Sequence, residues 1–199
     1  MNIGLFGGTF DPIHVGHLII AEEVRLKLAL DEVLFVPTGQ PWLKSERTVA
    51  CGEHRLEMLK LATGSNPHFK VSTVELERPG PSYSVDTVSA LKDELGAEVE
   101  LYFIVGFDAL AELPIWKEPS RLLDLCQVVG VRRPGYAELD WGSLERAIPG
   151  VSSRLIVVDV LQIDISSTQI RERVAKGLSI HYLVPEAVEG YISKNRLYT

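Results

Sequence analysis

The stretch FGGTFDPIHVGHL, residues 6–18, decides how this chain is interpreted. Between Gly7 and His17 it holds three glycines, one proline and two histidines, and it offers little bulk for a hydrophobic core. Glycine contributes no side-chain packing, so the stretch cannot be an ordinary core strand. Its spacing also differs from the G-x-G-x-x-G fingerprint of dinucleotide-binding folds. The structural role of this stretch therefore depends on the elements on either side of it.

An apolar run precedes this stretch, and a helical pattern begins near Gly16. The same alternation continues along the chain. Apolar runs predict buried strands at 2–6, 32–36, 69–74, 99–105, 127–131 and 155–158. Periodic stretches predict helices at 18–30, 52–62, 84–95 and 168–176. We therefore expect one α/β domain over residues 1–199, a doubly wound, mostly parallel, Rossmann-like sheet, with C-terminal helices from about residue 166 packed on it.

Composition excludes several classes of protein. With 46% hydrophobic and 24% charged residues the chain resembles a soluble globular protein, and no apolar run approaches the ~20 residues of a membrane span. The N-terminus lacks the features of a signal peptide, and Cys51 and Cys126 lack metal-like spacing, so we expect a cytoplasmic protein with reduced thiols. A net charge of −7 argues against nucleic-acid partners. It leaves room for a small polyanion and does not tell whether the chain forms a homo-oligomer.

A glycine loop between a strand and a helix suits phosphate binding. The N-terminus of a helix presents unpaired N–H groups, and glycines let the backbone approach a ligand closely. His14 and His17 are three residues apart in the first turn, so both imidazoles can face phosphate oxygens there. Two alternatives stay open: a metal pair that needs a third ligand, and a solvated turn with no ligand.

A second motif, ISSTQIR, occupies residues 165–171. Ser166 and Gln169 form an S-x-x-Q capping box, so Ser166 can simply cap a helix. Helix capping does not explain why three hydroxyl residues follow one another, or why Arg171 lies one turn further on. Hydroxyls and free amides backed by a guanidinium form a second anion site, and a pair of such sites suits a triphosphate.

Together the two motifs resemble the H-x-G-H nucleotidyltransferase superfamily, with its S-S-T-x-x-R signature. Within it the chain resembles the bacterial nicotinate-nucleotide adenylyltransferases from end to end. The further matches are VPTGQPWLK at 36–44, HRLEMLKLA at 54–62, RPGPSYSVDTV at 78–88, FIVGFDALAELPIWKEPSRLL at 103–123, VRRPGY at 131–136 and YLVPEAVEGYI at 182–192. The resemblance implies transfer of AMP from ATP to nicotinate mononucleotide, giving deamido-NAD and pyrophosphate. It also implies Mg²⁺ carried by the ATP phosphates rather than by protein ligands.

The same resemblance implies roles for individual residues. His17, His14, Lys44 and Arg171 would be catalytic. The phosphates and adenosine of ATP would be bound by Gly7, Gly8, Thr9, His14, His17, Gly106, Asp108, Ser166, Ser167, Thr168 and Arg171. Nicotinate mononucleotide would be bound by Gly8, Thr9, Ser84 and Trp116, with the indole stacked on the pyridine ring. This interpretation requires His17 and Arg171 to lie on the same side of the molecule.

The chain departs from the family pattern at two places. The family often has P-P-H-K where residues 41–44 read P-W-L-K, so the phosphate contact of that histidine must fall to Lys44 or be absent. Ser84 stands where threonine is common, which keeps the hydroxyl. Two rivals remain: an adenylyltransferase acting on phosphopantetheine or nicotinamide mononucleotide, and a regulator of the same fold that binds ATP without catalysis.

Overall fold

The computed structural model describes residues 1–40, 49–132, 139–161 and 163–199. Its centre is a six-stranded sheet in the order β3-β2-β1-β4-β5-β6, with each neighbouring pair parallel. The strands are β1 (Asn2–Gly8), β2 (Glu32–Pro37), β3 (Phe69–Val71), β4 (Glu100–Gly106), β5 (Gln127–Arg132) and β6 (Leu155–Asp159). The doubly wound α/β fold predicted from the sequence is thereby confirmed, and the strand order reverses between β1 and β4.

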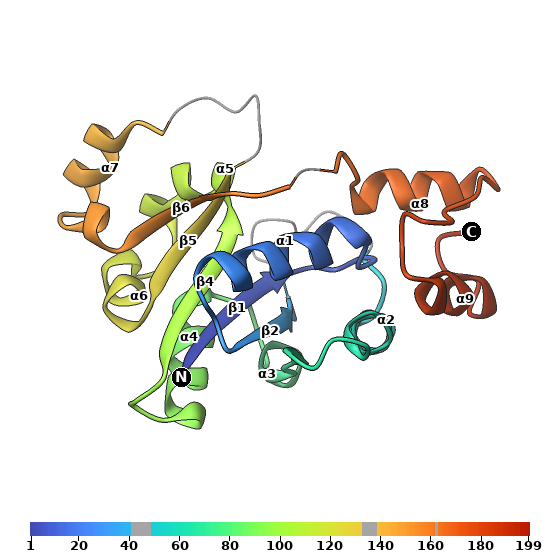
Figure 1. The fold of residues 1–199 in the computed structure, drawn as a ribbon, viewed down its shortest axis with the longest axis horizontal. Coiled ribbons are helices and arrows are strands. Elements are labelled where there is room, and N and C mark those ends of the chain that lie inside the picture. Colours follow the sequence, from blue (N-terminus) through green and yellow to red (C-terminus); the bar gives the residue numbers. More distant parts are fainter. Residues whose placement is uncertain (41–48, 133–138, 162) are drawn as a thin grey trace.

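Helices cover both faces of the sheet (Figure 1). The α-helices are α1 (Val15–Lys27), α2 (Gly52–Thr63), α3 (Val74–Glu77), α4 (Ser84–Leu95), α5 (Phe107–Ala111), α6 (Pro119–Leu125), α7 (Trp141–Ala147), α8 (Ser167–Ala175) and α9 (Glu186–Lys194). Short 3₁₀ turns are η1 (Leu113–Ile115) and η2 (Val151–Ser153). Within the described ranges, no helix is long and apolar enough to cross a membrane.

Strand side chains alternate between two hydrophobic clusters, one on each face. On β1, Leu5 joins the cluster that holds α4, α5, α6 and α7, whereas Phe6 joins the cluster that holds α1, α2, α8 and α9. Ile170 of α8 and Val188 of α9 are fully buried in that second cluster. The C-terminal helices therefore share the core of the sheet, and Figure 1 shows them beside α2.

Three predicted boundaries were wrong. The strand predicted over 2–6 continues through Gly7 and Gly8, which pair in parallel with Val36 and Pro37 of β2, so these two glycines belong to the strand and not to the loop. The strand predicted over 69–74 ends at Val71, and Val74 begins α3 instead. There the Ser72 hydroxyl accepts a hydrogen bond from the Val74 N–H at 3.3 Å, a local contact that turns the chain out of the sheet. The helix predicted over 18–30 runs from Val15 to Lys27, because Ala29 adopts a left-handed conformation (φ 49°) that no glycine announces.

Two predicted features lie outside the described residues. They are Lys44 and the departure at residues 42–43.

The two cysteines offer a test of the packing between α6 and β5. Burial raises the pKa of the Cys126 thiol to about 12, whereas Cys51 is exposed just before α2. Since the thiolate is the reactive form, we expect a disulfide reagent at about pH 8 to modify Cys51 rapidly and Cys126 only after denaturation. Cys51→Ser should remove the rapid phase. Rapid modification of both thiols in the folded chain would contradict this packing.

Candidate active site

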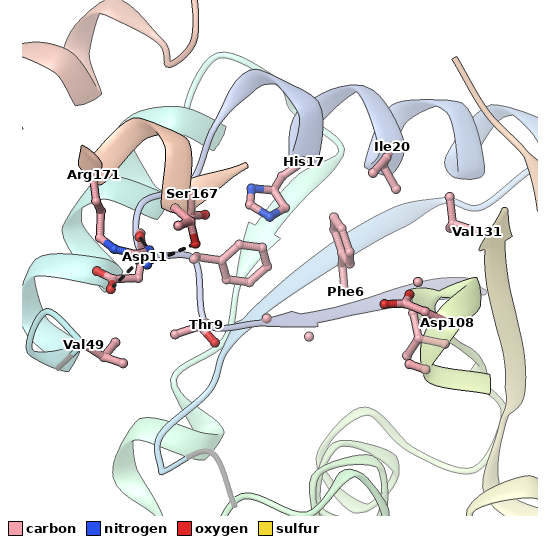
Figure 2. Close-up of a pocket in the computed structure, with 17 residues that line it drawn as sticks. Phe6, Thr9, Asp11, His17, Ile20, Val49, Asp108, Val131, Ser167 and Arg171 are labelled. Atoms are coloured by element: carbon pink, nitrogen blue, oxygen red, sulfur yellow. Dashed lines mark hydrogen bonds and ion pairs between the residues drawn. The ribbon is translucent and has the colours of Figure 1, made fainter. Parts of the chain in front are cut away.

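A cavity of about 420 Å³ lies where the carboxyl ends of β1 and β4 meet. In an open parallel sheet this is the topological switch point, where ligands bind. The cavity lining includes nine of the residues singled out from the sequence. These are Gly7, Gly8, Thr9, His17, Gly106, Asp108, Ser167, Thr168 and Arg171 (Figure 2).

The loop that follows β1 is shaped by Phe10. That residue takes a left-handed backbone conformation (φ 49°), which is costly for an aromatic residue and indicates a tightly constrained loop. Its ring lies against the loop backbone, so a Cβ added at Gly8 would sit 3.0 Å from the Phe10 Cζ atom. The absence of a side chain at Gly8, the last residue of β1, thus leaves room for the ring of Phe10.

The two histidines occupy different places at the start of α1. His14 is the N-cap residue and is only 6% exposed, and it does not line the cavity. His17 lies directly against it, with ring centroids 3.7 Å apart, and does line the cavity. Gly16 permits this stack, because a Cβ there would sit 3.1 Å from the His14 Nδ1 atom. The glycine of the H-x-G-H motif therefore leaves room for the His14 ring.

The orientation of His17 is held from several sides. Its Nδ1 atom accepts a hydrogen bond from the backbone N–H of His14 at 3.2 Å. Phe10 and Phe6 pack edge-on against its ring at centroid distances of 5.1 and 6.1 Å. A backbone N–H can only donate, so the neutral imidazole must carry its proton on Nε2. In its neutral form, His17 thus presents its Nε2–H as a donor on the wall of the cavity.

The N-terminus of α8 reaches the same cavity from the far end of the chain. Ser166 is its N-cap: the side chain accepts from Gln169 N–H at 3.2 Å, and Gln169 Oε1 accepts from Ser166 N–H at 2.9 Å. The predicted capping box is confirmed, and the Ser166 hydroxyl does not line the cavity. Ser167 and Thr168, the next two residues, do.

Side chains of α8 bind the loop that follows β1. The Ser167 hydroxyl donates to the Pro12 carbonyl at 2.9 Å, and Arg171 Nη1 donates to the Asp11 carbonyl at 2.7 Å. Arg171 Nη2 also donates to Thr168 Oγ1 at 3.2 Å. Figure 2 shows His17, Ser167 and Arg171 around one hollow. The required proximity of His17 and Arg171 is therefore present.

The β4 side of the cavity is formed by Gly106 and Asp108. Gly106 is the N-cap of α5, and a Cβ there would sit 2.4 Å from Asp108 Oδ1. Asp108 is exposed and is the carboxylate on this wall. An exposed carboxylate is an acceptor suited to hydroxyl or amino groups of a ligand.

Ser84 and Trp116 lie outside the cavity lining, beside the start of α4. Ser84 is the first residue of α4, and Lys117 binds Asp86 of the same helix turn at 2.9 Å. Trp116 packs edge-on against Phe103 at 6.2 Å, and its buried Nε1 has no hydrogen-bond partner among the described residues. The two residues therefore belong to neighbouring segments.

Sequence analysis missed three residues that support the cavity. Asp11 lines it and is 4% exposed, Arg55 is 3% exposed and donates to the Thr9 carbonyl at 2.9 Å, and Tyr198 donates to Asp11 Oδ1 at 2.7 Å. Burial lowers the pKa of the Arg55 guanidinium and raises the pKa of the Tyr198 phenol. Asp11 stood in the opening motif and Arg55 in HRLEMLKLA, but nothing local to Tyr198 signalled its contact.

The donor set is suited to phosphate rather than to a resident metal. Among the described residues no three His, Cys, Asp or Glu side chains gather as metal ligands. The cavity instead presents backbone amides, hydroxyls, an imidazole and a guanidinium. Oriented N–H donors at a helix N-terminus, together with a guanidinium, stabilise a bound anion such as a phosphate.

A family profile described as cytidylyltransferase-like matches residues 5–173. The parallel sheet and the phosphate-type cavity agree with that match, so the protein is a nucleotidyltransferase. A Dehalococcoides mccartyi protein is 46% identical over 198 residues, covering 100% of this chain and 97% of its own length. A Roseiflexus protein is 50% identical, with 98% and 97% covered. Both carry the name "Probable nicotinate-nucleotide adenylyltransferase". The chain belongs to the nicotinate-nucleotide adenylyltransferase family.

Solved structures agree on the fold. The Plasmodium falciparum nicotinic acid mononucleotide adenylyltransferase complexed with NaAD superposes with a TM-score of 0.77 at 20% identity. The match covers 99% of this chain and 97% of that one. At this identity the likeness supports the fold alone.

The protonation pattern of His17 can be measured directly. We expect ¹⁵N NMR of histidine-labelled protein near neutral pH to show the neutral His17 ring with its proton on Nε2, because Nδ1 accepts the His14 N–H. Comparison with the spectrum of His17→Asn would assign the signals. A neutral His17 with its proton on Nδ1 would contradict the arrangement at the start of α1.

Proposed function

We propose that the protein transfers AMP from ATP to nicotinate mononucleotide, forming deamido-NAD and pyrophosphate. The observation that carries this proposal is the meeting of two helix N-termini, those of α1 and α8, at one cavity that His17 and Arg171 both line. The names of relatives at 46–50% identity supply the acceptor substrate.

The reaction requires stabilisation of negative charge rather than removal of a proton. A phosphate oxygen of nicotinate mononucleotide attacks the α-phosphorus of ATP, and the bond from that phosphorus to the bridging oxygen of pyrophosphate breaks. The attacking oxygen is already anionic, so no general base is required. Repulsion between two anions and charge on the α-phosphate must instead be offset by fixed donors. The cavity supplies such donors, which favours direct in-line transfer without a covalent intermediate.

Three groups of residues would divide this work. The backbone of Gly7–Thr9 and the side chain of His17 would donate to the α-phosphate, with His14 stacked against His17 as its support. Ser167, Thr168 and Arg171, with Ser166 at the cap of the same helix, would hold the triphosphate. Lys44 would add a cation. Gly106 and Asp108 would contact the adenosine from the β4 side.

The nicotinate ring would bind beside the start of α4. Ser84 begins that helix, where free N–H groups favour a carboxylate. The half-buried indole of Trp116 would stack on the pyridine ring, and its buried Nε1 is a donor without a partner among the described residues. Gly8 and Thr9 would contact the nucleotide phosphate between the two sites.

Mg²⁺ would arrive with ATP. Bound to the triphosphate, it neutralises part of the charge on the phosphate oxygens. The described pocket has two carboxylates: Asp11, which already accepts hydrogen bonds from Tyr198 and Ala50, and the exposed Asp108. Its other polar groups are donors suited to phosphate, so we expect the phosphates of ATP rather than protein carboxylates to hold the metal. We also propose that the enzyme works in the cytoplasm on these small molecules, without nucleic-acid or membrane partners.

One assay tests the substrate assignment. Purified protein with ATP and Mg²⁺ should release pyrophosphate and form deamido-NAD with nicotinate mononucleotide, with less or no product from nicotinamide mononucleotide and none from phosphopantetheine. Preference for either of the other acceptors would overturn the assignment. ATP binding without pyrophosphate release from any acceptor would point instead to a nucleotide-binding regulator.

His17 can be tested by truncation. We expect His17→Ala to lower kcat by about 10²–10³-fold, the usual cost of losing one well-placed donor to a developing charge. The melting temperature should change little, because the ring packs at the cavity wall. His181→Ala provides a matched control, since that imidazole is 49% exposed and contacts Glu189 away from the cavity. Activity of His17→Ala equal to that of His181→Ala would exclude the assigned role.

A further inference from the structure

The C-terminus of the chain returns to the cavity. The Tyr198 hydroxyl donates to Asp11 Oδ1 at 2.7 Å, across a separation of 187 residues. Asp11 lies in the opening loop and lines the cavity, whereas Tyr198 does not. Tyr198 is therefore connected to the cavity through its hydrogen bond to Asp11.

The backbone near Tyr198 is held in a constrained conformation. Arg196 (φ 51°) and Tyr198 (φ 65°) both adopt the left-handed region, which costs a non-glycine residue free energy and persists only where surrounding contacts impose it. Between them Leu197 packs against the core and donates its N–H to the Ile192 carbonyl at 3.1 Å. These contacts direct the phenol of Tyr198 toward Asp11.

The carboxylate of Asp11 has two oxygens in different surroundings. Oδ1 accepts from the Tyr198 hydroxyl and from the Ala50 N–H, which lies 3.3 Å away. Oδ2 lies 3.9 Å from Arg171 Nη1, too far for a hydrogen bond. That Nη1 donates instead to the backbone carbonyl of Asp11 at 2.7 Å. Arg171 is thus held by the backbone carbonyl of Asp11, whereas the Asp11 carboxylate accepts hydrogen bonds from Tyr198 and Ala50.

Loss of the Tyr198 hydroxyl would change the hydrogen-bond partners of the Asp11 carboxylate. A buried carboxylate that loses a donor must find another, since an unsatisfied charge is costly. Two guanidinium groups lie near it. Arg55 already donates to the backbone carbonyls of Ala50 and Thr9, whereas a small rotation of the carboxylate would bring Oδ2 within hydrogen-bonding distance of Arg171. Arg171 would then be engaged by Asp11 in a charge-assisted pair and be less available to an anionic ligand.

We propose that Tyr198 is a positioning residue for the triphosphate site: by binding the Asp11 carboxylate, it keeps Arg171 available to ATP. This inference rests on the proposed function, and specifically on the role of Arg171 with ATP. Burial raises the pKa of the Tyr198 phenol, so it stays a hydrogen-bond donor throughout the working pH range.

Tyr198→Phe removes only the hydroxyl and keeps the ring. We expect the KM for ATP to rise about three- to tenfold, the scale of one ordinary intramolecular hydrogen bond, with the KM for nicotinate mononucleotide nearly unchanged. Tyr191→Phe is the matched control, because that hydroxyl contacts His54 Nδ1 at 2.9 Å and not Asp11. It should leave both KM values unchanged.

A double-mutant cycle with Asp11→Asn separates positioning from a merely structural role. Asparagine lacks the charge that would capture Arg171, so Tyr198→Phe should raise the KM for ATP in the wild-type background but not in the Asp11→Asn background. If Tyr198→Phe alone melts below the assay temperature, the double variant still decides, since its KM for ATP should match that of Asp11→Asn.

The outcomes are distinct. An equal rise in both backgrounds, or no rise in either, would overturn the proposal, as would a double variant that binds ATP markedly worse than Asp11→Asn. A loss of melting temperature in Tyr198→Phe with an unchanged KM for ATP would show a purely structural tail, and would also overturn it. Wild-type protein that forms no deamido-NAD would instead refute the proposed function.

Discussion

The site depends on one constraint: the start of α8 is bound to the loop that follows β1. Ser167 and Arg171 donate to the carbonyls of Pro12 and Asp11, residues about 155 positions earlier in the chain. These bonds bring the N-terminus of α8 to the cavity that the start of α1 also lines, and each helix end carries roughly half a positive charge. Ile170 anchors α8 in the core, so the placement is supported by packing as well as by polar contacts.

The local field at this cavity differs from that of the whole chain. A net charge of −7 would repel a nucleotide, yet the described cavity presents Arg171, with Arg55 buried beside the glycine loop. Asp11 lies between them. Its carboxylate accepts hydrogen bonds from the Tyr198 hydroxyl and the Ala50 N–H, and its Oδ2 is 3.9 Å from Arg171 Nη1, beyond hydrogen-bonding distance. Local geometry therefore decides which charges a ligand meets, and the sum over the chain does not.

Much of this could be predicted from sequence, because local patterns encode it. The apolar runs predicted all six strands, and the capping box at Ser166 predicted where α8 begins within one residue. Errors fell where a local side-chain hydrogen bond or a left-handed backbone conformation had no distinctive residue to mark it, as at Ser72 and Ala29. The different environments of His14 and His17 could not be predicted from spacing alone. The spacing predicts that both face one side of the first turn, but His14 is the N-cap residue stacked on His17, and only His17 lines the cavity, with Phe10 edge-on against its ring.

By itself the sequence determined the chemistry: a glycine loop, an H-x-G-H turn and a hydroxyl-rich helix start are patterns of residues a few positions apart, and short-range sterics and hydrogen bonding control them. It also determined the parallel α/β class, because hydrophobic periodicity is local. Only the tertiary structure decided that residues 11, 171 and 198 meet. That meeting depends on how the C-terminal helices dock on the sheet, and docking is set by the summed packing of residues far apart in the chain, which no short pattern contains.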